Sequence, residues 1–226
     1  MKIACTVGHS ILKNGNSTSA NGVVNEYKWC KEFVPMLVDT FKTQGVEADL
    51  IICPEKVFTS ASEEKPYKLN KIKNKGYDLV IESHLNAFNG SAKGTEVLYY
   101  PTSSKSKAFA QRVNDKLDDI FTDRGIKGRD NLYILRDTPC PSILIEYFFC
   151  DNSEDYSKAN TKEKMQLIAN KVVEGVLNKE LQKVPTTTSD TKLYAVCVGA
   201  YSKSNADSVL EEVKKKGYTD AYLIPR

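Results

Sequence analysis

The sequence lacks three features that would each define a class of protein. It has no hydrophobic run long enough to span a bilayer, so we expect no membrane insertion. It has no C-x-x-C pair, and its six cysteines are scattered, which predicts reduced and mostly buried thiols rather than a disulfide framework. It also has little net charge, with 32 basic against 29 acidic residues. A pI near 8.4 is below the value of about 9 typical of nucleic-acid-binding domains, so we expect no nucleic-acid partner.

The start of the chain, MKIACTVGHS, has no long apolar segment of the kind found in secretory signals. We therefore expect the protein to be made in the cytoplasm without a signal peptide.

Alternation of apolar runs with amphipathic segments predicts an α/β fold, a twisted and mostly parallel six-stranded sheet flanked by helices. A chain of 226 residues, 41% of them hydrophobic, can bury one such core and carry a small appendage. The six predicted strands cover residues 2–7, 46–53, 77–82, 95–100, 132–135 and 143–148.

A change in composition near residue 183 predicts a domain boundary. We assign residues 1–183 to a main domain and the polar segment 184–190, within VPTTTSDT, to a linker. The remainder, 191–226, reads as a small β-α-β unit with strands 192–198 and 219–224 and a helix over 204–216.

The two histidines are the most informative polar residues, because the sequence contains no others. His9 follows KIACTV and His84 follows YDLVIES, so both are predicted just beyond the carboxyl ends of strands. That edge of an open α/β sheet is where ligands bind. A single histidine is usually structural, but two in equivalent positions favour metal binding.

Two glutamates are candidates for the same site. Glu26 lies at the start of the first long helix, where an acidic residue is favourable for the helix alone, and spacing alone favours this role over metal binding. Glu146 interrupts the apolar run SILIEYFFC. A buried carboxylate must be paired, protonated or close to a metal ion, although a solvent-facing position at the strand end remains an alternative.

Four ordered segments resemble a known family. TVGHS, VVNEYKW, SHLNAFNG with GTEVLYY, and LYILRDTPCPSILIEYFFCDN are similar to the motif blocks of the zinc-dependent N-acetylmuramoyl-L-alanine amidases of the amidase-3 type, and most similar to clostridial phage endolysins. The resemblance extends from Lys2 to about Leu181. Ser10 is a departure, because a glycine often follows the histidine in the family.

The resemblance implies a Zn²⁺ cofactor held by His9, Glu26 and His84, with Glu146 as the catalytic residue and Asn86 lining the site. It implies a peptidoglycan hydrolase that cleaves the amide between N-acetylmuramic acid and L-alanine by zinc-activated water. The substrate partner is then bacterial peptidoglycan, and the place of action is the cell wall after release from the cell.

The tail, YAVCVGAYSKSNADSVLEEVKKKGYTDAYLI, resembles half of a SPOR-type repeat, a module that binds peptidoglycan glycan strands. A β-α-β unit of this size can hardly bury its own core. Two tails related by a two-fold axis would supply a whole SPOR-like domain, so a homodimer through residues 191–226 is a hypothesis beside wall binding.

Two other functions fit the same residues. One is a non-catalytic, zinc-containing cell-wall-binding protein, although structural zinc sites normally have four protein ligands and only three match here. The other is a zinc carboxypeptidase acting on stem peptides, which would share the metal chemistry and release a different product.

Overall fold

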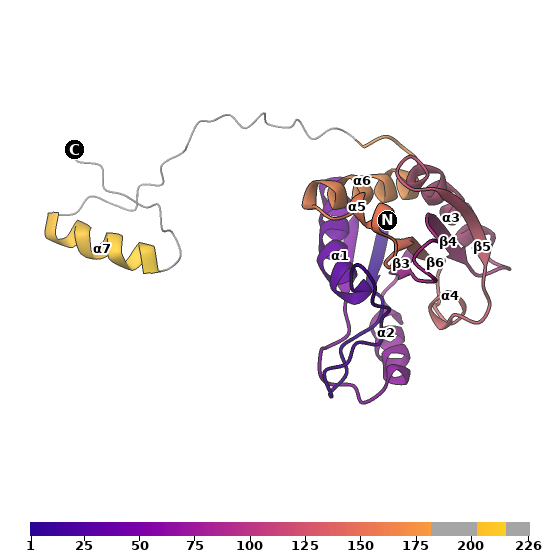
Figure 1. Ribbon diagram of the computed structural model, residues 1–226, viewed down its shortest axis with the longest axis horizontal. Helices are drawn as coiled ribbons and strands as arrows, with labels where there is room; N and C mark the ends of the chain where they lie inside the picture. The colour runs from indigo at the N-terminus through magenta and orange to yellow at the C-terminus, as the bar shows by residue number, and fades with distance from the viewer. Residues whose placement is uncertain (182–202, 216–226) are drawn as a thin grey trace. The chain divides into compact units, whose positions relative to one another are not determined.

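The computed structural model of the protein describes residues 1–181 and 203–215 (Figure 1). Within these ranges, six strands form one sheet in the order β2-β1-β3-β6-β4-β5. Neighbouring strands are parallel except for the antiparallel pair β4 and β6, so the predicted mostly parallel sheet is confirmed. The strands are β1 (Lys2–Val7), β2 (Glu47–Ile51), β3 (Leu79–Asn86), β4 (Thr95–Tyr99), β5 (Asp123–Gly128) and β6 (Ser142–Phe149).

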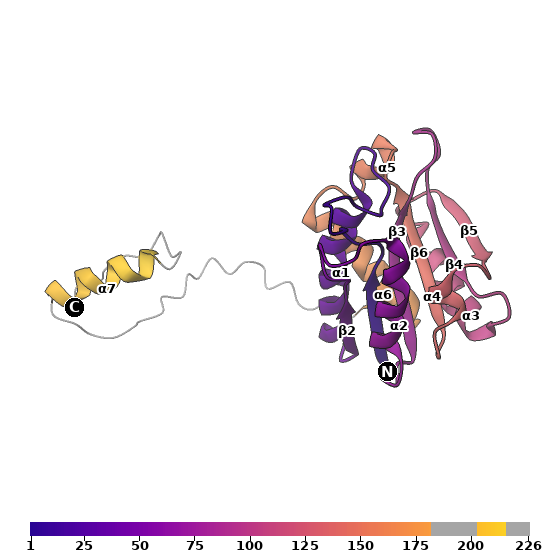
Figure 2. The same ribbon diagram turned by 90° about the horizontal axis from the view of Figure 1, so that it is seen from below.

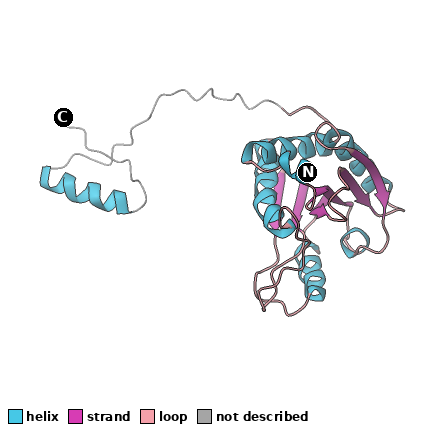
Figure 3. Ribbon diagram, in the orientation of Figure 1, coloured by secondary structure: helices cyan, strands magenta, loops and turns pink. Residues whose placement is uncertain are grey.

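Helices cover both faces of this sheet (Figures 1 and 3). Three long helices pack against one another and against one face: α1 (Glu26–Thr43), α3 (Ser104–Leu117) and α6 (Lys162–Leu177). The other face carries α2 (Glu64–Ile72), which follows the short 3₁₀ turn η1 (Ala61–Glu63), and α4 (Tyr133–Arg136). Seen from below, α2 and α4 lie in front of the sheet (Figure 2). The short helix α5 (Ser153–Ser157) follows β6.

Each face has its own hydrophobic core. The larger one lies under α1, α3 and α6 and includes Phe33, Leu37 and Tyr147, all nearly fully buried. The smaller one lies under α2 and α4 and joins Ile72 and Ile134 to side chains of the central strands. Because both faces are covered, the central strands are mostly apolar, and a polar residue inside one of them needs a specific partner.

One predicted strand is wrong and one strand was missed. The predicted strand over residues 132–135, LYIL, is instead the N-cap Leu132 and the first three residues of α4, because a short apolar run has the same pattern whether it is a buried helix turn or a buried strand. The sixth strand is β5, whose sequence DRGIKG has two glycines and three charges. It is an edge strand that pairs only with β4, and most of its side chains are not buried, so no hydrophobic pattern marks it.

The chain divides into two compact units, Met1–Gln182 and Lys183–Arg226. In the second, the structure describes α7 (Lys203–Lys215), which agrees with the predicted helix over 204–216. The predicted linker 184–190 and strands 192–198 and 219–224 lie outside the described residues. None of the described helices is both long and apolar enough to cross a membrane. All five cysteines in the described ranges are free thiols, and four of them are buried.

Candidate metal centre

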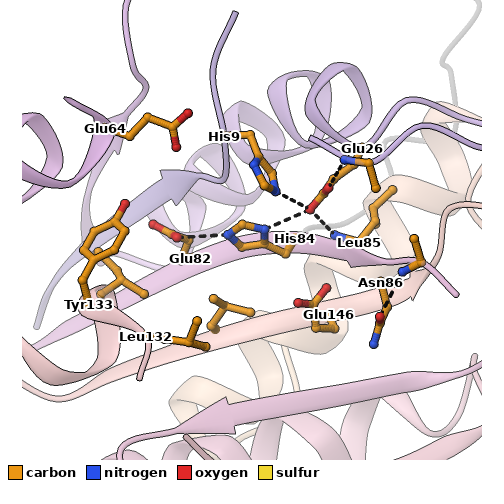
Figure 4. A pocket seen from close by; sticks show the side chains of 14 residues that line it. His9, Glu26, Glu64, Glu82, His84, Leu85, Asn86, Leu132, Tyr133 and Glu146 are labelled. Atoms are coloured by element: carbon orange, nitrogen blue, oxygen red, sulfur yellow. Dashed lines mark hydrogen bonds and ion pairs between the residues drawn. The ribbon is translucent and has the colours of Figure 1, made fainter. Parts of the chain in front are cut away.

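Three predicted side chains meet at the carboxyl edge of the parallel strands (Figure 4). His9 lies two residues beyond β1, Glu26 is the first residue of α1, and His84 lies near the end of β3. The strand extends further than predicted, so His84 is inside β3 rather than beyond it. Glu26 Oε1 lies 3.1 Å from His9 Nε2 and 2.9 Å from His84 Nδ1. One carboxylate oxygen thus faces one ring nitrogen of each histidine.

The start of α1 determines where the Glu26 carboxylate lies. The Asn25 side chain caps the helix by accepting a hydrogen bond from the Lys28 backbone N–H, so the helix begins at Glu26. Glu26 Oε2 then accepts from the Ala20 N–H at 2.9 Å, and Oε1 accepts from the Leu85 N–H at 3.1 Å. Burial alone would raise the pKa of Glu26, but the hydrogen bonds from His84 and His9 lower it well below its usual range. Glu26 is therefore an ionised and firmly held carboxylate.

These residues fit a divalent metal ion. One ligand atom from each of His9, Glu26 and His84 can be chosen so that all three lie within 4.8 Å of one another. Two imidazoles and one carboxylate form an established ligand set for catalytic zinc, which keeps a fourth position open. Burial lowers the pKa of His84, but hydrogen bonds with Glu26 and Glu82 raise it to about 10. A metal ion must therefore compete with a proton for this histidine.

The backbone of the first loop is shaped by close packing. His9 has a φ of 64°, an uncommon conformation for a residue with a side chain, and such strain often occurs at functional sites. Before it, Gly8 lies directly against the ring of His84. A Cβ at Gly8 would lie 2.5 Å from His84 Cε1 and 2.7 Å from the Ser83 carbonyl oxygen. Only glycine fits here.

We expect Gly8→Ala to displace the His84 ring or separate β1 from β3. Overpacking of this kind costs about 1–3 kcal/mol of folding free energy, and the displaced ring should bind metal more weakly. Thermal unfolding and a metal titration measure the two effects. Gly128→Ala is the control, because its new Cβ would come no closer than 3.1 Å to any neighbour. If the Gly8→Ala protein has the same unfolding temperature and the same metal affinity as the parent, Gly8 does not hold the His84 ring in place.

Glu146 lies beside the three converging side chains. It pairs with His84 across β3 and β6, and its Oε2 is buried with no hydrogen-bond partner among the described residues. Burial raises the pKa of Glu146 to about 7, with His84 opposing the shift and the carboxylates of Glu26 and Glu96 adding to it. A carboxyl group with a pKa near neutrality can both accept and release a proton.

On its other side, Glu146 faces Glu96 across the antiparallel pair of β4 and β6. Glu96 Oε2 accepts hydrogen bonds from Arg124 Nε at 3.0 Å and Lys127 Nζ at 2.6 Å, and its Oε1 accepts from Asn86 Nδ2 at 3.3 Å. The charge of Glu96 is thus compensated by two cations. No cation pairs with Glu146 in the part of the chain that the structure describes, so the two neighbouring glutamates have different environments.

A cavity of about 380 Å³ opens over this arrangement. All four predicted site residues and Asn86 line it, so the structure brings together every residue that the sequence singled out. Its lining also includes three polar residues that sequence reasoning missed: Glu64, Glu82 and Tyr133. Glu82 could have been found by the argument used for Glu146, because it too is an acid inside an apolar strand, LVIESHLN. Glu64 carries no comparable signal, since it lies in the polar segment SEEKPYK.

Within the described residues, a cavity at the edge of a helix-flanked sheet joins a candidate metal-ligand set to an unpaired carboxyl group, an arrangement that can support hydrolysis. The family profile described as N-acetylmuramoyl-L-alanine amidase matches residues 3–178, and the chain belongs to this family.

The chain is also similar to individual proteins described as amidases or endolysins. The catalytic domain of the CD27L endolysin, described as targeting Clostridia difficile, is 54% identical with a TM-score of 0.78, covering 80% of this chain and 99% of that one. A sporulation-specific N-acetylmuramoyl-L-alanine amidase of Bacillus subtilis is 30% identical over 70% of this chain and 61% of its own length. An uncharacterised cell wall amidase of Bacillus anthracis is 37% identical over 47% of this chain. The chain spans 22% of the length of this last protein and 61% of that of the sporulation-specific amidase, so it corresponds to only part of each of these two relatives.

Proposed function

We propose that this chain is an endolysin-like peptidoglycan hydrolase that cleaves the amide between the lactyl group of N-acetylmuramic acid and L-alanine, using a zinc ion held by His9, Glu26 and His84. The convergence of these three side chains beside the unpartnered Glu146 carboxyl carries the proposal. Membership of the amidase family supports the choice of bond. The likeness to an endolysin catalytic domain supports the choice of substrate.

A zinc ion in such a site supplies Lewis acidity, which lowers the pKa of water and polarises a carbonyl oxygen. Glu146 accepts the proton of the attacking water and passes it to the nitrogen of the departing L-alanine. The C–N bond breaks as the new C–O bond forms, leaving a lactyl carboxylate and a free amine. No serine or cysteine nucleophile is required.

Digestion of purified cell wall tests the bond that is cut. We expect new L-alanine amino termini to appear without new reducing sugar ends, and we expect chelator to prevent their appearance. Terminal labelling and a reducing-sugar assay on the same digest measure both products. Reducing ends would indicate a glycosidase. Release of a C-terminal amino acid would indicate a carboxypeptidase.

We further propose that residues 191–226 associate with the same segment of a second molecule or with the wall. The described helix supports this proposal, because Ala206, Val209, Leu210 and Val213 form one stripe at helical spacing. All four side chains are half-buried, whereas most of the other described residues of α7 are exposed. A helix with such a stripe needs a partner surface.

Deletion of everything after Val184 should give a soluble monomer that binds zinc and cuts isolated peptidoglycan but binds whole walls less tightly. The full-length chain should be a dimer, because paired tails would bury the apolar stripe. Light scattering on both proteins at tens of micromolar measures this difference. A monomeric full-length protein would rule out the dimer.

A further inference from the structure

Each candidate histidine ligand has a second ring nitrogen, and both of these nitrogens lead to buried carboxylates. His84 Nε2 lies 3.0 Å from Glu82 Oε1. The other oxygen of Glu82 accepts hydrogen bonds from Lys68 Nζ at 3.0 Å and Thr6 Oγ1 at 2.9 Å. The side chains of Lys68 and Glu82 are only 1% and 4% exposed. The charge of the Glu82 carboxylate is therefore compensated, and an ionised carboxylate can only accept a hydrogen bond, so His84 Nε2 must be the donor.

His9 reaches a carboxylate through one intermediate hydroxyl. Its Nδ1 lies 3.3 Å from Thr18 Oγ1, which lies 2.6 Å from Glu64 Oε1. A hydroxyl has one proton, and the short distance to the carboxylate oxygen places that proton between Thr18 and Glu64. Thr18 Oγ1 must then accept from His9, so Nδ1 of His9 carries the ring proton.

The two histidines consequently present opposite nitrogens to Glu26. His9 keeps its proton on Nδ1 and offers Nε2, whereas His84 keeps its proton on Nε2 and offers Nδ1. We propose that Glu82 and the Thr18–Glu64 pair are positioning residues, which fix these opposite tautomers and thereby set the affinity of the site for zinc. The inference rests on the zinc site of the proposed function and adds residues that hold its ligands.

Helix α2 contributes to the hydrogen bonds behind both histidines, although it supplies none of the three ligand atoms. Glu64 and Lys68 lie four residues apart on this helix, hence on the same side of it, and both are buried. Glu64 accepts the hydrogen bond of Thr18 behind His9, and Lys68 compensates the charge of Glu82 behind His84. Ser10, where the family often has glycine, also donates to Glu64 Oε1 at 2.8 Å, which gives this departure a role.

The tautomers can be read directly by nitrogen NMR of the full-length chain, labelled at histidine with ¹⁵N and loaded with zinc. Only two histidines contribute, so the spectrum is simple. We expect one ring protonated at Nδ1 and bound through Nε2, and the other protonated at Nε2 and bound through Nδ1. Two rings with the same tautomer would overturn the inference. A full-length chain that binds no zinc would overturn both this inference and the proposed function, so the two failures are distinguishable.

Two variants test whether these contacts set zinc affinity. Thr18→Val removes the hydroxyl acceptor with little change in shape, and Thr18→Ser, the conservative control, retains it. The double variant Glu82→Leu/Lys68→Met removes the acceptor of His84 without leaving an unpaired buried charge, which is the change a folded core tolerates best.

Competition with a chromophoric chelator gives the zinc dissociation constant of each protein. We expect Thr18→Val and the double variant each to bind zinc about 10–100-fold more weakly, and Thr18→Ser to bind as the parent does. Circular dichroism of each protein establishes that it is folded. Unchanged zinc affinity in a folded Thr18→Val protein would overturn the assignment for His9, and in the folded double variant the assignment for His84.

Discussion

We expect Glu146→Gln to lower the rate of wall cleavage by about 10²–10⁴-fold and to leave zinc content unchanged, because general acid–base catalysis typically contributes a factor of this size. Glutamine has nearly the same volume as glutamate but cannot carry the proton. Glu146 is not among the three converging ligands, and its Oε2 has no hydrogen-bond partner in the described part of the chain, so no metal contact is lost. Initial rates on purified wall, together with metal analysis, measure both effects.

Glu174→Gln is a matched control for this experiment. Glu174 is also a buried glutamate whose Oε2 has no hydrogen-bond partner among the described residues, but it lies on α6, outside the cavity. The same chemical change there should leave the rate of wall cleavage unaltered. A Glu146→Gln protein that turns over at nearly the parental rate would exclude the proton-transfer role.

We expect His84→Ala to abolish wall cleavage and zinc binding together, and we expect chelation of the parent to abolish cleavage in the same way. The reason is that His84 supplies one of the three ligand atoms that converge within the described residues, and its ring also fills the space beside Gly8. His9→Ala and Glu26→Ala should behave alike. Atomic absorption after dialysis, paired with a cleavage assay, measures both losses.

Added zinc provides the control, since it should restore the chelated parent and fail to restore His84→Ala. Full zinc occupancy in the His84→Ala protein would show that the metal binds elsewhere. Cleavage by a thoroughly chelated parent would show that the reaction does not need the metal.

Much of the candidate site follows from one topological rule. The carboxyl ends of neighbouring parallel strands meet at one edge, so two histidines after two apolar runs are expected to lie close together. The rule depends only on strand positions, which the apolar pattern predicts well for β1, β3 and β6. Glu26 is different, because its place depends on a helix start fixed by Asn25 and on the Ala20 N–H, and helical periodicity contains neither.

Other parts of the arrangement depend on contacts between distant segments. Thr18 and Glu64 are 46 residues apart, and Lys68 and Glu82 are 14 apart on different elements. A single sequence gives no sign that such residues touch. The edge strand β5 was missed for a similar reason, since its half-exposed side chains owe their structure to pairing with β4 rather than to a hydrophobic pattern.

The identity of the bond that is cut tests the account most directly. Mass spectrometry of the soluble products from purified peptidoglycan should find intact stem peptides that begin with a free L-alanine, and glycan chains whose muramic acid carries an unsubstituted lactyl carboxylate. The same digest with Glu146→Gln should yield these products far more slowly. Muropeptides that still join N-acetylmuramic acid to L-alanine, released by a break anywhere else, would contradict the proposed function.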